Sequence, residues 1–125
     1  MVQNGMIRPV FAPVDGPSGG KNMANRPIDT AHLAQQTMHD ADLQREVLLI
    51  FIDQLVTARK EISSAQGEAR KRLAHKLKGA ARAVGAFDLS ECAERLMEQP
   101  DDLDDLQKLD MLADEAGRFA QLLAG

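Results

Sequence analysis

The sequence predicts an all-α protein: an antiparallel four-helix bundle with a short extra helix at its N-terminal end. The 125 residues suffice for a single domain. Aromatic residues make up only 3% of the chain, with no Trp or Tyr, so a core must be built from Leu, Ala, Val, Ile and Met. Leu and Ala are strong helix formers. Apolar residues recur at helical spacing and never alternate strictly, as they would in half-buried strands.

Two regions are expected, a flexible N-terminal tail over residues 1–26 and a folded helical domain over residues 27–125. Prolines and glycines recur through the first region, and no hydrophobic period accompanies them. Such a composition favours a mobile segment over a packed one.

The first two helices of the domain are marked by aspartates. Asp29 is the expected N-cap of a short helix that runs to about residue 38, and Asp40 is the expected N-cap of a long helix over about 41–63. The apolar stripe predicted for the long helix consists of Leu43, Val47, Ile50, Phe51, Gln54, Leu55, Ala58 and Ile62.

The last two helices also carry start and stop signals. Asp88 with Glu91 has the form of a capping box and opens a helix that stops at Pro100. Asp101 is the expected cap of the final helix, whose first turn is rich in acidic residues, as the helix dipole favours. Its predicted stripe consists of Leu103, Leu106, Leu109 or Asp110, Ala113, Ala116, Phe119 and Leu123.

The helix between these pairs, predicted over about 68–84 and ended by Gly85, carries the most informative residues. Leu73, Leu77 and Val84 lie on its apolar stripe. His75 lies about 200° around the helix from Leu77 and is expected to point away from the core. Its neighbours at helical spacing are mostly cations: Lys71, Arg72, Lys78 and Arg82.

Gly79 stands one turn beyond this histidine. Glycine inside a helix costs roughly 1 kcal/mol relative to alanine, and a missing side chain there leaves room for a bulky group to reach the ring. A neutral imidazole is a nucleophile. The ammonium group of Lys78 can offset negative charge on transferring oxygens. An exposed histidine, a nearby lysine and a positive local field therefore suit the acceptance of a phosphoryl group.

The run His75-Lys76-Leu77-Lys78-Gly79, with Gly85 ten residues after the histidine, resembles the signature of histidine-containing phosphotransfer (HPt) domains. The resemblance implies a four-helix bundle that carries phosphohistidine at His75 and exchanges the phosphoryl group with aspartates of receiver domains. Lys78 would contact the phosphoryl oxygens and Gly79 would allow approach. The partner-binding residues would be Lys71, Arg72, Lys76 and Arg82.

The same resemblance implies a phosphoryl carrier, which is not an enzyme with turnover of its own. The expected partners are response-regulator receiver domains, with a hybrid sensor histidine kinase as a further candidate. Any Mg²⁺ would belong to the receiver, so no cofactor and no metal are expected. No exposed apolar heptad stands out, and a monomer is expected.

Composition and cysteine usage limit the expected cellular location and the classes of partner. Cys92 is the only cysteine, which excludes an intrachain disulfide, and its place on an apolar stripe predicts a packed core thiol. With no signal peptide visible, a cytoplasmic location is expected. The longest apolar run, over residues 47–52, is far shorter than the ~20 residues that span a bilayer. A net charge of −4, with no aromatics in the basic stretch, disfavours nucleic acid as a partner.

Other chemistries have weaker support. His32 and His39 lie about 10 Å apart along a helix, too far to share a metal ion, and are interpreted as structural surface histidines. A histidine kinase would need a nucleotide-binding domain with glycine-rich loops, for which no length remains. A hydrolase would need paired carboxylates or an oriented triad, whereas the helical neighbours of His75 are cations. The remaining alternative is a helical docking module that binds receivers or another acidic protein without accepting phosphate.

Overall fold

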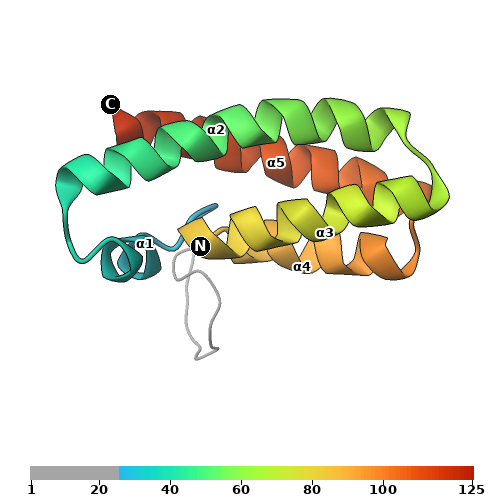
Figure 1. Cartoon of the computed structure of the whole chain (residues 1–125), viewed down its shortest axis with the longest axis horizontal. Coiled ribbons are helices and arrows are strands. Elements are labelled where there is room, and N and C mark those ends of the chain that lie inside the picture. The colour runs from blue at the N-terminus through green and yellow to red at the C-terminus, as the bar shows by residue number, and fades with distance from the viewer. Residues whose placement is uncertain (1–25) are drawn as a thin grey trace, which may run out of the picture.

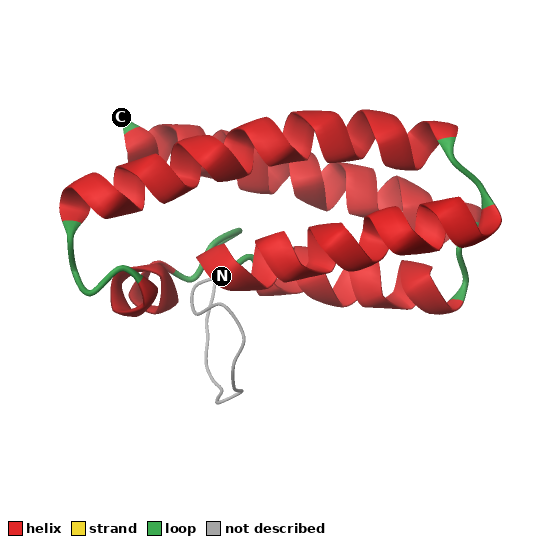
Figure 2. Cartoon of the chain, in the orientation of Figure 1, coloured by secondary structure: helices red, strands yellow, loops and turns green. Residues whose placement is uncertain are grey.

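The computed structural model describes residues 26–125, which form five α-helices. No strand occurs within that range (Figure 2). The all-α prediction is confirmed. The flexible tail expected over residues 1–26 lies, apart from Arg26, outside the described residues. The helices are α1 (Thr30–Gln36), α2 (Ala41–Ser64), α3 (Gly67–Val84), α4 (Phe87–Glu98) and α5 (Leu103–Ala124).

Four of these helices form the bundle (Figure 1). α3 packs on both α2 and α4, α5 packs on both α2 and α4, and the short helix α1 lies against α3. The connections between bundle helices are short, which favours antiparallel neighbours. The predicted four-helix bundle with an extra N-terminal helix is therefore confirmed. Its largest fully buried side chains are Phe51, Ile28, Leu48, Ile62, Leu89, Leu96, Leu109 and Cys92.

The stripe predicted for α2 is right at its centre and wrong at one edge. Phe51, Leu55 and Ile62 are buried, whereas Ile50 is 57% exposed and Leu48, absent from the predicted stripe, is buried. Successive residues of a helix differ by 100°. A helix that packs on two neighbours has several apolar arcs of similar quality, so the pattern alone does not choose the innermost one.

The stripe predicted for α5 is wrong at both ends. Leu103 is 72% exposed and Leu123 is 40% exposed, while the buried positions of α5 are mostly alanines. Small side chains let two helices approach closely. At Gly117, an added Cβ would lie 3.5 Å from Cδ1 of Leu55 on α2, an ordinary van der Waals contact. The buried face of α5 is therefore made mostly of small residues, which a search for large apolar side chains undervalues.

The first two helix starts match their predictions. The Asp29 carboxylate accepts the His32 amide at 3.1 Å, and the Asp40 carboxylate accepts the Leu43 amide at 3.0 Å. Each aspartate satisfies a backbone N–H that has no partner within its own helix.

The next two caps differ from prediction. The capping box at Asp88 is wrong, because α4 already begins at Phe87 and its N-cap residue, Ala86, makes no side-chain cap bond. The last helix is capped by Asp102, which accepts the Asp105 amide at 3.0 Å, and not by Asp101. The Asp101 carboxylate instead accepts the Gly67 amide at 3.1 Å, so it ties the turn before α5 to the start of α3.

Arg70 belongs to this same junction. The sequence places it within the basic stretch, but its side chain is only 7% exposed. Its Nε donates to the carbonyl of Ile62 and its Nη1 to the carbonyl of Pro100, both at 2.9 Å. Nη1 also lies 3.7 Å from the Asp101 carboxylate. Arg70 therefore connects the end of α2, the first turns of α3 and the α4–α5 turn.

The C-terminal end of α3 is fixed by Gly85, as predicted. Gly85 has a φ of 91°, in the left-handed region, and its amide bonds back to the carbonyl of Arg82 at 3.2 Å. Its own carbonyl accepts the amide of Asp29 at 2.9 Å. A Cβ added to Gly85 would lie 2.8 Å from the carbonyl oxygen of Asp29. Only glycine satisfies both the left-handed backbone and this close approach.

We therefore expect Gly85→Ala to lower the free energy of unfolding by about 2 kcal/mol, since a left-handed alanine costs roughly 1–2 kcal/mol before the contact with Asp29 is counted. Urea denaturation followed by circular dichroism measures this change. Gly79→Ala is the matched control, because an added Cβ meets nothing within 4 Å there, and it is expected to stabilise the protein. Equal denaturation midpoints for the wild type and Gly85→Ala would contradict the assignment.

Cys92 is fully buried, as the sequence predicts for a core thiol. Its Sγ lies 3.5 Å from the carbonyl of Asp105, and burial raises the pKa of the thiol. A raised pKa keeps the group protonated and poorly nucleophilic at neutral pH. Among residues 26–125, no helix combines the length and apolarity needed to cross a bilayer.

Candidate functional site

His75 lies near the middle of α3, on its outer face. Ala74 and Leu77, close to His75 in the sequence, are buried in the core, whereas His75 itself is exposed. The helix begins eight residues before His75 and ends nine residues after it. The ring is therefore presented to solvent by well-formed helix on both sides, as the helical spacing predicted.

Lys78 follows on α3 at the i+3 position, which lies on the same side of the helix as His75. Its side chain is 22% exposed and leans toward α4, where its Nζ lies 3.8 Å from Oε2 of Glu94. The Glu94 side chain is 54% exposed. The cation that the sequence assigns to the site is thus present beside the histidine, and it is paired with a carboxylate of the neighbouring helix.

Gly79 leaves an open surface one turn beyond His75. It is exposed, and a Cβ added to it would meet nothing within 4 Å. Neither helix packing nor a left-handed backbone therefore requires glycine at this position. The gap lies on the solvent side of α3.

The other predicted cations also lie on α3 and are exposed: Lys71, Arg72, Lys76 and Arg82. Within residues 26–125, none of the four is part of an ion pair. Their positive charge is therefore available to an acidic partner. All seven predicted site residues lie on α3, and the Lys78 side chain also contacts α4.

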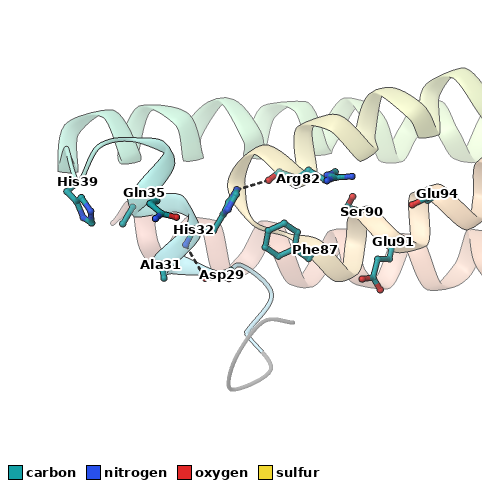
Figure 3. Close-up of a pocket in the computed structure, with 11 residues that line it drawn as sticks. Asp29, Ala31, His32, Gln35, His39, Arg82, Phe87, Ser90, Glu91 and Glu94 are labelled. Carbon is teal, nitrogen blue, oxygen red and sulfur yellow. Dashed lines mark hydrogen bonds between the residues drawn. The ribbon is translucent and has the colours of Figure 1, made fainter. Parts of the chain in front are cut away.

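A groove of about 830 Å³ adjoins this face, between α1, the end of α3 and α4 (Figure 3). Arg82 and Glu94 line it together with residues of α1. The ring of His32 donates from Nε2 to the carbonyl of Arg82 at 3.1 Å and packs edge-on against Phe87, with ring centroids 5.0 Å apart. The carbonyl belongs to the last turn of α3 and also accepts the Gly85 amide at 3.2 Å, so His32 adds a second hydrogen bond that ties α1 to the end of α3.

The contacts of His32 join α1 to the end of α3. His32 is partly buried and His39 is exposed in the α1–α2 turn. Within the described part of the chain, no three His, Cys, Asp or Glu side chains are grouped so that they could hold a metal ion.

Residues 46–122 match the family model described as Hpt domain. The chain belongs to the Hpt family. Hpt domains are phosphocarrier modules of two-component phosphorelays, in which they interact with receiver domains. Neither curated proteins nor solved structures gave a match. The matched region of this Hpt domain begins inside α2, so α1 and its contacts with α3 lie outside it.

Two features of this Hpt domain could not be found in the sequence. Glu94 reads as one of several exposed acidic residues of α4, and its partner becomes visible only when the register between α3 and α4 is known. His32 reads as a surface residue of a short helix, and nothing local indicates that it reaches the end of α3, fifty residues later.

Gly79→Leu tests the role of the open surface. Leucine is a better helix former than glycine, so the free energy of unfolding is expected to rise by up to ~1 kcal/mol. Phosphorylation of His75 is expected to slow by on the order of tenfold to a hundredfold, because the new side chain displaces the incoming group. The measurement is the rate of label uptake from a phosphorylated receiver. Ala83→Leu, also exposed on α3, is the control that should keep the wild-type rate, and an unimpaired Gly79→Leu would show that the gap has no role.

Proposed function

We propose that this Hpt domain is a phosphorelay intermediate that accepts a phosphoryl group from a receiver-domain aspartate onto His75 and passes it to the aspartate of another receiver. The single observation that supports this most strongly is the placement of His75. It is an exposed imidazole in mid-helix, with Lys78 beside it and open space over Gly79.

In the proposed transfer, the neutral Nε2 of His75 attacks the phosphorus of the receiver's acyl phosphate. A P–N bond forms as the P–O bond to the aspartate breaks, and the aspartate leaves as a carboxylate. The ring keeps its proton on Nδ1 and becomes cationic, so that charge and atoms balance. The Lys78 ammonium offsets negative charge on the transferring oxygens. The reverse reaction delivers the group to a second receiver.

The exposed cations of α3 would guide the encounter. A receiver presents an acidic phosphorylation site, and the uncompensated charges of Lys71, Arg72, Lys76 and Arg82 would attract it. Attraction of this kind raises the association rate and weakens as salt increases. In this role the domain acts as a monomeric, cytoplasmic carrier, with no cofactor of its own. A hybrid sensor histidine kinase is a candidate source of the donor receiver.

The test is phosphotransfer from a panel of receiver domains carrying a labelled phosphoryl group. The expected result is rapid transfer from at least one receiver, giving a label that is labile in acid and stable in base, as phosphohistidine is. Binding to receivers without any label would favour the docking module instead. The same panel identifies the fastest donor and acceptor, and therefore the direction of flow.

A further inference from the structure

The pair formed by Lys78 and Glu94 raises a question about the proposed site. Lys78 is the cation that would contact the phosphoryl oxygens, yet its Nζ lies 3.8 Å from the Glu94 carboxylate. Among the carboxylates of residues 26–125, only that of Glu94 lies within 4.0 Å of this ammonium. The two side chains come from adjacent helices, α3 and α4, which pack against each other.

The geometry of the pair makes it easy to open. Strong charge-assisted hydrogen bonds between nitrogen and oxygen are about 2.7–2.9 Å long, and this contact is about an ångström longer. Glu94 is more than half exposed, so water screens the attraction. The Lys78 side chain is only 22% exposed, but the length of the contact and the exposed carboxylate make the pair comparable to surface pairs, which typically change an equilibrium by only a few-fold.

A phosphoryl group at His75 would compete well for the same cation. It carries nearly two negative charges and three acceptor oxygens, whereas the Glu94 carboxylate carries one charge. Since Lys78 lies one turn from His75, a rotation of its side chain away from α4 would suffice, and no backbone movement is needed.

We infer that Glu94 is a positioning residue, which holds the Lys78 ammonium against α4 in the unphosphorylated protein and gives it up when a phosphoryl group arrives at His75. The inference rests on the proposed function, because it assumes that His75 accepts the group. Glu94 then opposes phosphorylation, because its negative charge occupies the cation that would assist the transfer. Removing that charge should make His75 easier to phosphorylate.

The experiment uses phosphoramidate, a small phosphoryl donor for histidine, so that no receiver has to be identified. The full chain is compared with Glu94→Gln, and ³¹P NMR follows the appearance of phosphohistidine. We expect Glu94→Gln to be phosphorylated about threefold faster than the wild type, the size of effect typical of an exposed ion pair. The control is Glu98→Gln, which removes the same charge from an exposed residue one turn further along α4 and should stay at the wild-type rate.

A double-mutant cycle separates a role through Lys78 from a general effect of charge. In the Lys78→Met background, the replacement of Glu94 should no longer accelerate labelling. The side-chain ¹H–¹³C signals of Lys78 provide a second readout. In the wild type they should shift on phosphorylation, and in unphosphorylated Glu94→Gln they should already differ from the wild type, with an unchanged thermal midpoint.

The outcomes separate the two proposals. If His75 is labelled but Glu94→Gln behaves as Glu98→Gln does, or accelerates labelling equally without Lys78, the positioning role is wrong while the proposed function stands. If the wild type takes up no label from phosphoramidate or from any receiver, the proposed function fails, and the inference fails with it.

Discussion

Replacing His75 by glutamine is expected to abolish phosphoryl transfer without disturbing the fold. The side chain is exposed on α3 and contributes nothing to the buried core, and glutamine is a good helix former. The amide of glutamine has no nucleophilic lone pair on nitrogen, so no P–N bond can form. The measurement is transfer of labelled phosphoryl from the fastest receiver, with circular dichroism to verify an unchanged helix content and melting temperature.

His39→Asn is the control for this variant. His39 is also exposed but has a φ of 61°, a left-handed conformation that asparagine tolerates better than most residues. This control should take up label as the wild type does. A label that persists in His75→Gln would place the phosphoryl group on another residue and would refute the proposed acceptor. Receiver binding that is equally strong in both variants, without label in the wild type, would identify a docking module.

Arg70→Met is expected to cause the largest loss of stability, about 3 kcal/mol. Methionine preserves much of the buried volume, but it leaves the carbonyls of Ile62 and Pro100 without their donor and the Asp101 carboxylate without its cation. Buried acceptors that lose a partner cost about 1–3 kcal/mol each. The pair with Asp101, whose side chain is 70% exposed, adds little to this loss. For a domain of this size, such a loss lowers the melting temperature by more than 10 °C, on the order of 4–8 °C per kcal/mol.

Arg72→Met provides the comparison for Arg70. Arg72 lies two residues away on the same helix but is exposed, so its replacement should change the free energy of unfolding by no more than about 0.5 kcal/mol. Differential scanning calorimetry or denaturant titration distinguishes the two. Similar stabilities for both variants would mean that the contacts of Arg70 contribute little to the fold.

Much of this fold follows from local patterns. Five helices, their order and the caps at Asp29, Asp40 and Gly85 were predictable, because each depends on residues close together in the chain. The exposure of His75 was predictable for the same reason, since helical periodicity fixes its angle relative to Leu77.

The sequence is least informative where a residue's partner lies on another segment. Asp101 looks like a helix cap, but its carboxylate accepts the Gly67 amide at the start of α3, and Asp102 caps α5 instead. Arg70 looks like one more surface cation, but its buried guanidinium donates to the backbone carbonyls of Ile62 and Pro100. The pairing of Lys78 with Glu94 likewise depends on the register of α3 against α4, which no local pattern specifies.

The two anchored ends of α3 bear on how quickly a docked receiver could dissociate. Gly67 and Arg70 tie one end to the turn before α5, and Gly85 and His32 tie the other end to the start of α1 and its first turns. The backbone beneath His75 is therefore ordered before any receiver arrives, and docking has only side chains to immobilise. A backbone that is already ordered removes an entropic cost of docking, so a small interface is enough for binding. A small interface can also dissociate quickly. Rapid departure suits the proposed role, because a carrier with a single acceptor histidine cannot meet its acceptor until its donor has left.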